Sequence, residues 1–157
     1  MRALIQRVTR SSVTVEDRVV GKIDRGFTVL LGVEDADDDF DVEYIAKKIA
    51  ALRVFEDEEG KMNRALSEVG GSVLLISQFT LYADTRKGNR PSFVGAGKPE
   101  HANRLYQEVA KRLNEKGIAV ETGVFAAHMT VQITNDGPVT IWIDSAEMRK
   151  TTTKPVE

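Results

Sequence analysis

The sequence predicts a β-rich α/β domain that carries two long helices. Apolar and polar residues alternate near both ends of the chain, whereas two stretches between them repeat apolar residues at helical spacing. With 157 residues, 41% of them hydrophobic, the chain can bury one core and is too short for two. We therefore expect one domain over residues 1–147, followed by a flexible tail over residues 148–157.

The first third of the chain predicts a meander of short strands. The expected strands cover residues 3–8, 13–15, 19–23 and 27–33, with turn-prone residues at 17–18 and 24–26. From Asp37 the apolar spacing becomes helical, with Ile45, Ile49 and Leu52 on one face. Acidic residues begin this stretch and basic residues end it, which suits the dipole of a helix.

The middle of the chain predicts a buried strand and a second helix. Residues 56–61 form a charged turn, and the continuous apolar run 73–79 has the length of a buried strand. Residues 86–98 form a loop rich in glycine and arginine. Pro99 then opens a helix that Gly117 closes. The apolar face of this helix consists of Ala102, Leu105, Val109 and Leu113.

The last quarter predicts three further strands, over residues 118–121, 129–134 and 139–143. Between the last two, Asn135 to Thr140 includes an Asn-Asp-Gly-Pro sequence, which is typical of a tight hairpin turn.

Composition excludes several classes of function. The chain has no cysteine and two histidines, so a thiol nucleophile is impossible and a multi-histidine metal site is not expected. A G-x-S-x-G nucleophile motif is missing. A net charge of −2 favours a local basic patch over a general polyanion-binding surface. Without a leader or an apolar run of membrane-spanning length, we expect a cytoplasmic protein that needs no metal or cofactor.

Two stretches resemble ion-binding loops but lack required residues. In the acidic segment from Asp35, Phe40 replaces the turn glycine of a calcium loop and Ala46 replaces its last carboxylate. We interpret this segment as a solvated helix start. Near residues 95–98, Ser92 and Pro99 break the phosphate-loop pattern. His101 is expected in solvent, and His128 is expected to be a packing or surface residue.

Four motifs together resemble the D-aminoacyl-tRNA deacylase family. They are Gln6-Arg7-Val8, Ser77 to Leu81, Lys87 to Phe93, and Asn135 to Thr140, and their order and spacing match over about residues 1–145. The resemblance implies a mixed, largely antiparallel, barrel-like sheet with two helices packed outside. It also implies a homodimer with active sites at the subunit interface. The implied substrate is tRNA carrying a D-amino acid or glycine, which is hydrolysed to free tRNA and amino acid.

The resemblance also implies where the reaction takes place. It puts the scissile ester beside Ser77, Gln78, Phe79 and Thr80. Two mechanisms remain open: Thr80 acts as a nucleophile, which requires a nearby base, or backbone amides near Phe79 and Thr80 stabilise the oxyanion while a ribose hydroxyl assists water. The second is favoured because these motifs contain no histidine.

A backbone filter for the substrate's handedness is the second implication. In the family, the peptide bond matching Gly137-Pro138 is cis and enters the partner subunit's active site, and the arginine matching Arg7 steadies its carbonyls. The side chain of an L-amino acid would meet these carbonyls, whereas a D-amino acid or glycine would pass. Met129 is expected to line the pocket. Ala126 and His128 differ from the family's usual glycine and its acidic residue or methionine.

A basic loop is the expected tRNA contact. Arg86, Lys87, Arg90 and Lys98 suit phosphates near the acceptor end, although each could equally be a solvated loop residue.

Three alternatives differ from this interpretation. A relaxed deacylase that tolerates L-substrates would carry threonine at the position of Pro138. A dimeric nucleic-acid-binding factor without catalysis is disfavoured by the pI of about 5.8. A general esterase would need a nucleophile paired with a base, which the sequence does not supply.

Overall fold

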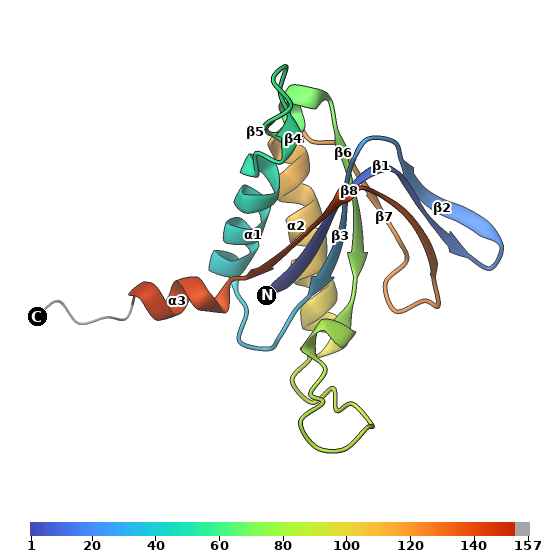
Figure 1. The fold of residues 1–157 in the computed structure, drawn as a ribbon. Coiled ribbons are helices and arrows are strands. Elements are labelled where there is room, and N and C mark those ends of the chain that lie inside the picture. Colours follow the sequence, from blue (N-terminus) through green and yellow to red (C-terminus); the bar gives the residue numbers. More distant parts are fainter. Residues whose placement is uncertain (153–157) are drawn as a thin grey trace, which may run out of the picture.

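The structure is a computed structural model that describes the backbone of residues 1–152 and the side chains of residues 1–149. Six strands form one mixed sheet, and β1 lies at its centre (Figure 1). Strand β1 pairs antiparallel with β2, β3 and β8, whereas β3–β6 and β6–β7 are parallel. The strands are β1 (Arg2–Val15), β2 (Arg18–Ile23), β3 (Gly26–Gly32), β6 (Ser72–Ser77), β7 (Val120–Thr122) and β8 (Thr130–Asp144).

The sheet curls until it is nearly closed. Strand β2 contacts β6 and β7, and a Cβ added at Gly21 would lie 2.6 Å from the carbonyl oxygen of Thr122. Only glycine allows the two strands to approach this closely. The curled sheet encloses a small apolar core of Val8, Val13, Ile23, Leu74 and Ile76. The predicted mixed, β-rich domain is therefore confirmed.

Two long helices cover one face of the sheet, as predicted. Helices α1 (Asp39–Ala51) and α2 (Pro99–Glu115) lie side by side (Figure 1). Their buried faces and the sheet form the main core, which includes Phe27, Val29, Ile45, Ile49, Leu75, Leu105, Val109 and Leu113. The Tyr106 hydroxyl donates a hydrogen bond to the Leu75 carbonyl at 2.8 Å, which joins α2 to β6.

The acidic start of α1 is less solvated than predicted. Asp38 caps the helix and accepts a hydrogen bond from the Phe40 amide at 3.0 Å. Asp37 and Asp41, however, are buried. Their carboxylates bind the Met1 ammonium at 2.6 Å and the Ser145 hydroxyl at 2.6 Å. The prediction is wrong for these two residues, because polar groups from both ends of the chain replace water around them.

Short elements fill the connections. They are β4 (Phe55–Glu56), β5 (Met62–Arg64), the 3-10 helices η1 (Leu66–Val69) and η2 (Phe79–Tyr82), and α3 (Ala146–Thr152). The charged turn at 56–61 joins β4 to β5. Residues 148–152, the first part of the predicted tail, are helical, and Arg149 binds the buried Asp41 carboxylate at 2.5 Å. The rest of the predicted tail, 153–157, lies outside the described residues. Within the described residues, no helix combines the length and apolarity required to span a membrane.

Two strands are longer than the sequence indicates. The predicted strands 3–8 and 13–15 are one strand, β1, whose polar middle pairs with β8. The residues expected to form a hairpin, Asn135 to Thr140, instead lie inside β8. Both halves of β8 pair with β1 in the same antiparallel direction, which a hairpin would reverse. The turn sequence forms a bulge: residues 136–139 lie opposite the single residue Arg7.

Candidate functional site

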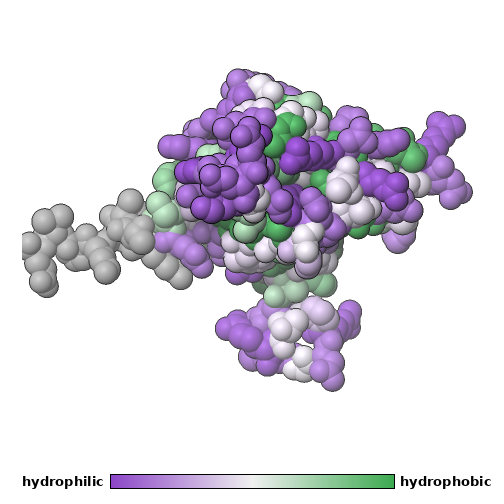
Figure 2. Space-filling model, turned by 45° about the horizontal axis from the view of Figure 1, so that its top comes forward, coloured by the Kyte–Doolittle hydropathy of each residue, from purple (hydrophilic) through white to green (hydrophobic). Residues whose placement is uncertain are grey.

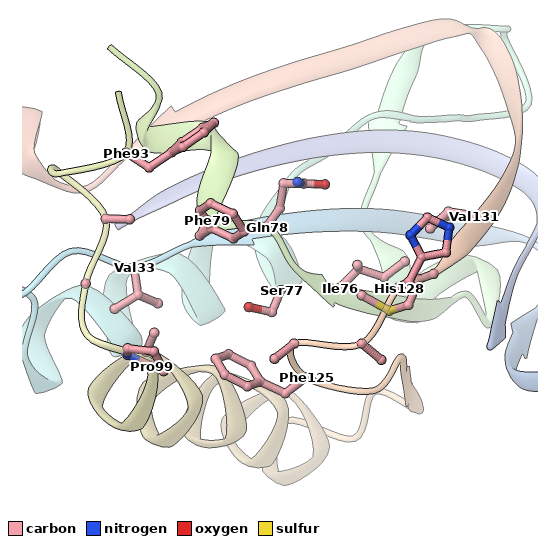
Figure 3. A pocket seen from close by; sticks show the side chains of 16 residues that line it. Val33, Ile76, Ser77, Gln78, Phe79, Phe93, Pro99, Phe125, His128 and Val131 are labelled. Atoms are coloured by element: carbon pink, nitrogen blue, oxygen red, sulfur yellow. The ribbon is translucent and has the colours of Figure 1, made fainter. Parts of the chain in front are cut away.

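A cavity of about 550 Å³ opens at the carboxyl end of β6 (Figure 3). Strand β6, helix η2, the start of α2 and the segment before β8 surround it. The lining residues are Val33, Ile76, Ser77, Gln78, Phe79, Phe93, Ala96, Gly97, Pro99, Ala102, Phe125, Ala126, Ala127, His128, Met129 and Val131. Polar side chains follow a buried apolar strand here, so this is the point where β6 presents hydrogen-bonding groups to solvent.

Aromatic rings form much of the cavity wall. Phe79 and Phe93 meet edge to face with ring centroids 5.1 Å apart, and Phe125 packs against Tyr106. Ser77 points into the space between them (Figure 3). A cavity with several aromatic walls and few polar groups suits a flat, partly polar ligand such as a nucleobase.

The first two amides of η2 are free to bind an anion. The Gln78 amide donates to the Leu31 carbonyl at 2.8 Å, and the Leu81 amide donates to the Gln78 carbonyl at 3.3 Å. Among the described residues, no acceptor binds the amides of Phe79 or Thr80. The first N–H groups of a helix have no acceptor within the helix. Two such neighbouring donors can stabilise the negative charge that develops on an oxygen atom.

The Thr80 hydroxyl lacks a base. Its Oγ1 accepts a hydrogen bond from Gln78 Nε2 at 2.5 Å, and Thr80 is not among the residues that line the cavity. His128 lines the cavity but makes no hydrogen bond with Thr80 within the described structure. A threonine hydroxyl without a proton acceptor is a poor nucleophile. The geometry therefore favours the amides over the hydroxyl.

Arg2 holds the far end of η2. Its guanidinium donates to the Leu81 carbonyl at 2.8 Å and lies 4.4 Å from the centre of the Tyr82 ring. Tyr82 is buried, and this burial raises the pKa of its hydroxyl, which stays protonated. The turn that carries the two free amides is thus fixed by a charged hydrogen bond and a cation–π contact.

Ala126 has a left-handed backbone conformation at the cavity wall. Its φ is 64°, which costs an L-residue about 1–2 kcal/mol. We expect Ala126→Gly to raise the free energy of unfolding by about 0.5–1 kcal/mol, measured by urea denaturation. Ala127→Gly is the matched control and should lower it by about the same amount, because its φ is not positive. Destabilisation by Ala126→Gly would show that the penalty of this conformation is smaller than the entropy cost of glycine.

The Gly137-Pro138 bulge lies outside the cavity of its own chain. The peptide bond is cis, both residues are exposed, and neither lines the cavity. Buried Arg7 donates from Nε to the Asp136 carbonyl at 2.9 Å and from its terminal nitrogen to the Val54 carbonyl at 2.6 Å. Arg7 therefore anchors the carbonyl just before Gly137, not those of the Gly-Pro pair.

Comparison with known proteins decides the family. Residues 4–144 match the family described as D-Tyr-tRNA(Tyr) deacylase. A D-aminoacyl-tRNA deacylase of Thermus aquaticus is 60% identical over 147 residues, covering 94% of this chain and 97% of the relative. One of Bacillus pumilus is 58% identical, covering 94% and 100%. The chain belongs to the D-aminoacyl-tRNA deacylase family.

A solved structure with the same fold belongs to a protein with a different name. The c-Myc DNA Unwinding Element Binding Protein superposes with a TM-score of 0.86 at 41% identity, covering 92% of this chain and 99% of that one. The resemblance recognised from the four motifs is thus confirmed, and relatives named as deacylases are hydrolases of ester bonds.

The basic loop of this family member projects from the body of the molecule. Residues 84–92 form a hydrophilic projection, closed by two backbone hydrogen bonds between Asp84 and Ser92 at 2.7 and 2.9 Å (Figures 1 and 2). Arg86 binds Asp84 through two nitrogens, and these hydrogen bonds lower the pKa of Asp84 to about 2. In the part of the chain that the structure describes, the charged side-chain ends of Lys87, Arg90 and Lys98 form no ion pair, although the Lys98 backbone amide donates to the Asp35 carboxylate at 2.9 Å.

The structure brings together only part of the predicted site. Ser77, Gln78, Phe79 and Met129 line one cavity, and Thr80 adjoins it. Gly137, Pro138 and Arg7 lie elsewhere in the same chain. Sequence reasoning did not assign a role to most of the apolar lining residues, and it expected His101 in solvent. His101 is half-buried instead, with Nε2 3.0 Å from the Asp37 carbonyl oxygen.

Proposed function

We propose that this protein hydrolyses the ester that joins a D-amino acid, or glycine, to the terminal ribose of tRNA. The observation that carries the proposal is the pair of free amides at the start of η2, beside an aromatic-walled cavity. The terminal nucleobase would stack in the cavity, which puts the ester next to Phe79 and Thr80. Family membership supports the same substrate.

In the proposed reaction, water attacks the ester carbonyl carbon. Negative charge then develops on the carbonyl oxygen and is bound by the amides of Phe79 and Thr80. The bond to the ribose oxygen breaks, that oxygen takes up the proton that the attacking water loses, and free tRNA and amino acid leave. Thr80 is not the proposed nucleophile, because no histidine hydrogen-bonds to its hydroxyl in the described structure. In this proposal the adjacent ribose hydroxyl helps to position the water.

Chirality would be read by a second copy of the chain. Gly137 and Pro138 do not line their own cavity, but they are exposed on a bulge that another subunit can receive. In the proposed homodimer, their carbonyls face the substrate's α-carbon in the partner's cavity. An L-side chain would collide with them, a D-side chain would point away, and glycine would pass. The proposed role is proofreading of translation in the cytoplasm.

Release of amino acid from D-tyrosyl-, L-tyrosyl- and glycyl-tRNA, measured with chelator present, tests the proposal. We expect fast loss of the D and glycyl esters with the L ester spared. Equal attack on D and L esters would indicate the relaxed type of deacylase. If neither ester is cleaved while duplex DNA is bound in a salt-dependent manner, the DNA-binding alternative is supported.

The projecting loop is the proposed phosphate-binding surface. The logarithm of the binding constant for a nucleic acid falls linearly with the logarithm of the salt concentration. Removing one cation that binds phosphate makes this negative slope less steep by about 0.7–0.9. We expect Lys87→Ala and Arg90→Ala to show this decrease in tRNA binding. Arg86→Ala should show less, because its guanidinium is already paired with Asp84. Arg18→Ala, which removes an exposed cation at the first residue of β2, is the control. Equal slopes for all four variants would rule out this surface.

A further inference from the structure

Asn135 closes the base of the bulge that carries Gly137 and Pro138. Its Oδ1 accepts a hydrogen bond from the Val139 amide at 2.8 Å. Its Nδ2 donates to the Val139 carbonyl at 3.1 Å and to Thr140 Oγ1 at 3.2 Å. A primary amide accepts and donates at the same time, so one side chain binds both backbone groups of Val139.

Gln6 and Arg7, which are neighbours in β1, also bind the bulge through their side chains. Arg7 donates to the Asp136 carbonyl at 2.9 Å, at the opposite end of the bulge. Gln6 Nε2 donates to Thr140 Oγ1 at 3.3 Å, so this hydroxyl is held from two sides. The bulge is therefore fixed at its first residue and at its last. The two residues between these points, Gly137 and Pro138, project from it.

The bulge depends on these side chains because the backbone of β1 does not pair with it. Residues 136–139 have no partner in the register of β1 with β8, which passes from Gln6 opposite Thr140 to Val8 opposite Asn135. Backbone groups in such a bulge lack the ladder that fixes a regular strand. Without the Asn135 amide, the amide and carbonyl of Val139 lose the side-chain partner that binds them both, and the bulge can move.

We propose that Asn135 is a positioning residue for chiral selection, because its side chain sets where the carbonyls of Gly137 and Pro138 lie. This inference rests on the proposed function, in which those carbonyls exclude L-substrates. Asn135 does not line the cavity of its own chain. Its removal therefore affects which substrate is accepted and leaves the chemical step, carried out at η2, in place. The same residue would act on the partner's site, because the bulge enters the partner.

The test measures D- and L-tyrosyl-tRNA hydrolysis by the full-length Asn135→Ala protein in one preparation. The ratio of the two rates does not depend on how much protein is folded. We expect the D:L ratio to fall by about 10- to 100-fold, through a rise in the L rate, while the D rate changes by less than about threefold.

Two further variants sharpen the test. Asn135→Asp keeps an acceptor for the Val139 amide but loses both donated hydrogen bonds, so its ratio should lie between those of the wild type and the alanine variant. Thr134→Ala is the matched control, since Thr134 is exposed on the same strand and its side chain makes no hydrogen bond within the described structure. Its ratio should equal that of the wild type.

The outcomes separate this inference from the proposed function. If the wild type spares the L ester and both Asn135 variants spare it equally, Asn135 does not position the filter, and the proposed function is unaffected. If the wild type does not discriminate between the two esters, the filter itself is wrong, and the inference is overturned with it. A loss of the D and L rates in equal proportion would assign Asn135 a structural role only.

Discussion

Replacing Thr80 with proline should lower kcat for D-aminoacyl-tRNA by about 100- to 1000-fold, the usual cost of removing one oxyanion-binding donor. Thr80 is the second residue of η2, where the fixed φ of proline is compatible with a helical turn. The substitution removes an amide hydrogen that has no acceptor among the described residues. The measurement is single-turnover hydrolysis, which reports the chemical step without product release.

Two other variants separate the amide from the hydroxyl. Thr80→Ala keeps the amide and removes the hydroxyl, so it should lower kcat by less than about tenfold if the amides stabilise the oxyanion. If Thr80 is instead the nucleophile, the alanine and proline variants should be equally inactive. Ser67→Pro is the control for inserting proline at the second residue of a 3-10 helix, since the Ser67 amide in η1 also lacks an acceptor in the described structure. Its kcat should match the wild type.

The fold was predictable where the signal is local and repetitive. Ile45 and Ile49 in one helix, and Leu105 and Val109 in the other, repeat over several turns, so both long helices could be recognised without tertiary information. Strand β1 could not be recognised as one continuous strand, because its polar middle breaks the apolar pattern. The buried Ser11 hydroxyl donates to the Gln132 carbonyl at 2.8 Å, a partner far along the chain that sequence reading does not reveal.

The bulge in β8 shows why a correct motif gave a wrong structure. Asn135, Asp136, Gly137 and Pro138 are each typical of a turn, and between two apolar stretches they predict a hairpin. Pairing with β1 on both sides overrides this preference, and the turn residues are used to leave the strand and return to it. The hydrogen bonds of Asn135 and Arg7, which make this possible, depend on a register that exists only in the folded sheet.

The cavity was predictable only in part for a related reason. The motif at Ser77 to Leu81 located one wall, since polar residues that follow a buried strand are exposed at its end. The other walls come from separate elements: Val33 follows β3, Ala102 lies on α2 and Val131 lies on β8. Each is an ordinary apolar residue in its local sequence, so nothing marks it as part of a site before the elements pack together.

Adding a methyl group at Gly137 should reduce the D:L rate ratio by at least about 100-fold, which corresponds to about 2.7 kcal/mol of lost discrimination. Gly137 has φ 139°, a conformation that L-residues rarely adopt. A Cβ there would lie 2.8 Å from Val139 Cγ2, 3.0 Å from the Val139 amide nitrogen and 3.3 Å from an Arg7 terminal nitrogen. The bulge must move to relieve these contacts, and a backbone filter tolerates displacements of only about 0.5 Å.

The readout is the ratio of L- to D-tyrosyl-tRNA hydrolysis by Gly137→Ala. This ratio should rise because the displaced bulge no longer excludes the L ester, while the partner's η2 amides still support hydrolysis of both esters. Pro138→Thr should change the ratio in the same direction, as in the relaxed type of deacylase. Gly60→Ala is the matched control: Gly60 also has a positive φ, 75°, but its added Cβ meets nothing within 4 Å. It also places an L-residue at a positive φ but displaces no filter, so its ratio should stay at the wild-type value. Intact rejection of L-tyrosyl-tRNA by Gly137→Ala would place chiral selection elsewhere, in the walls of the cavity itself.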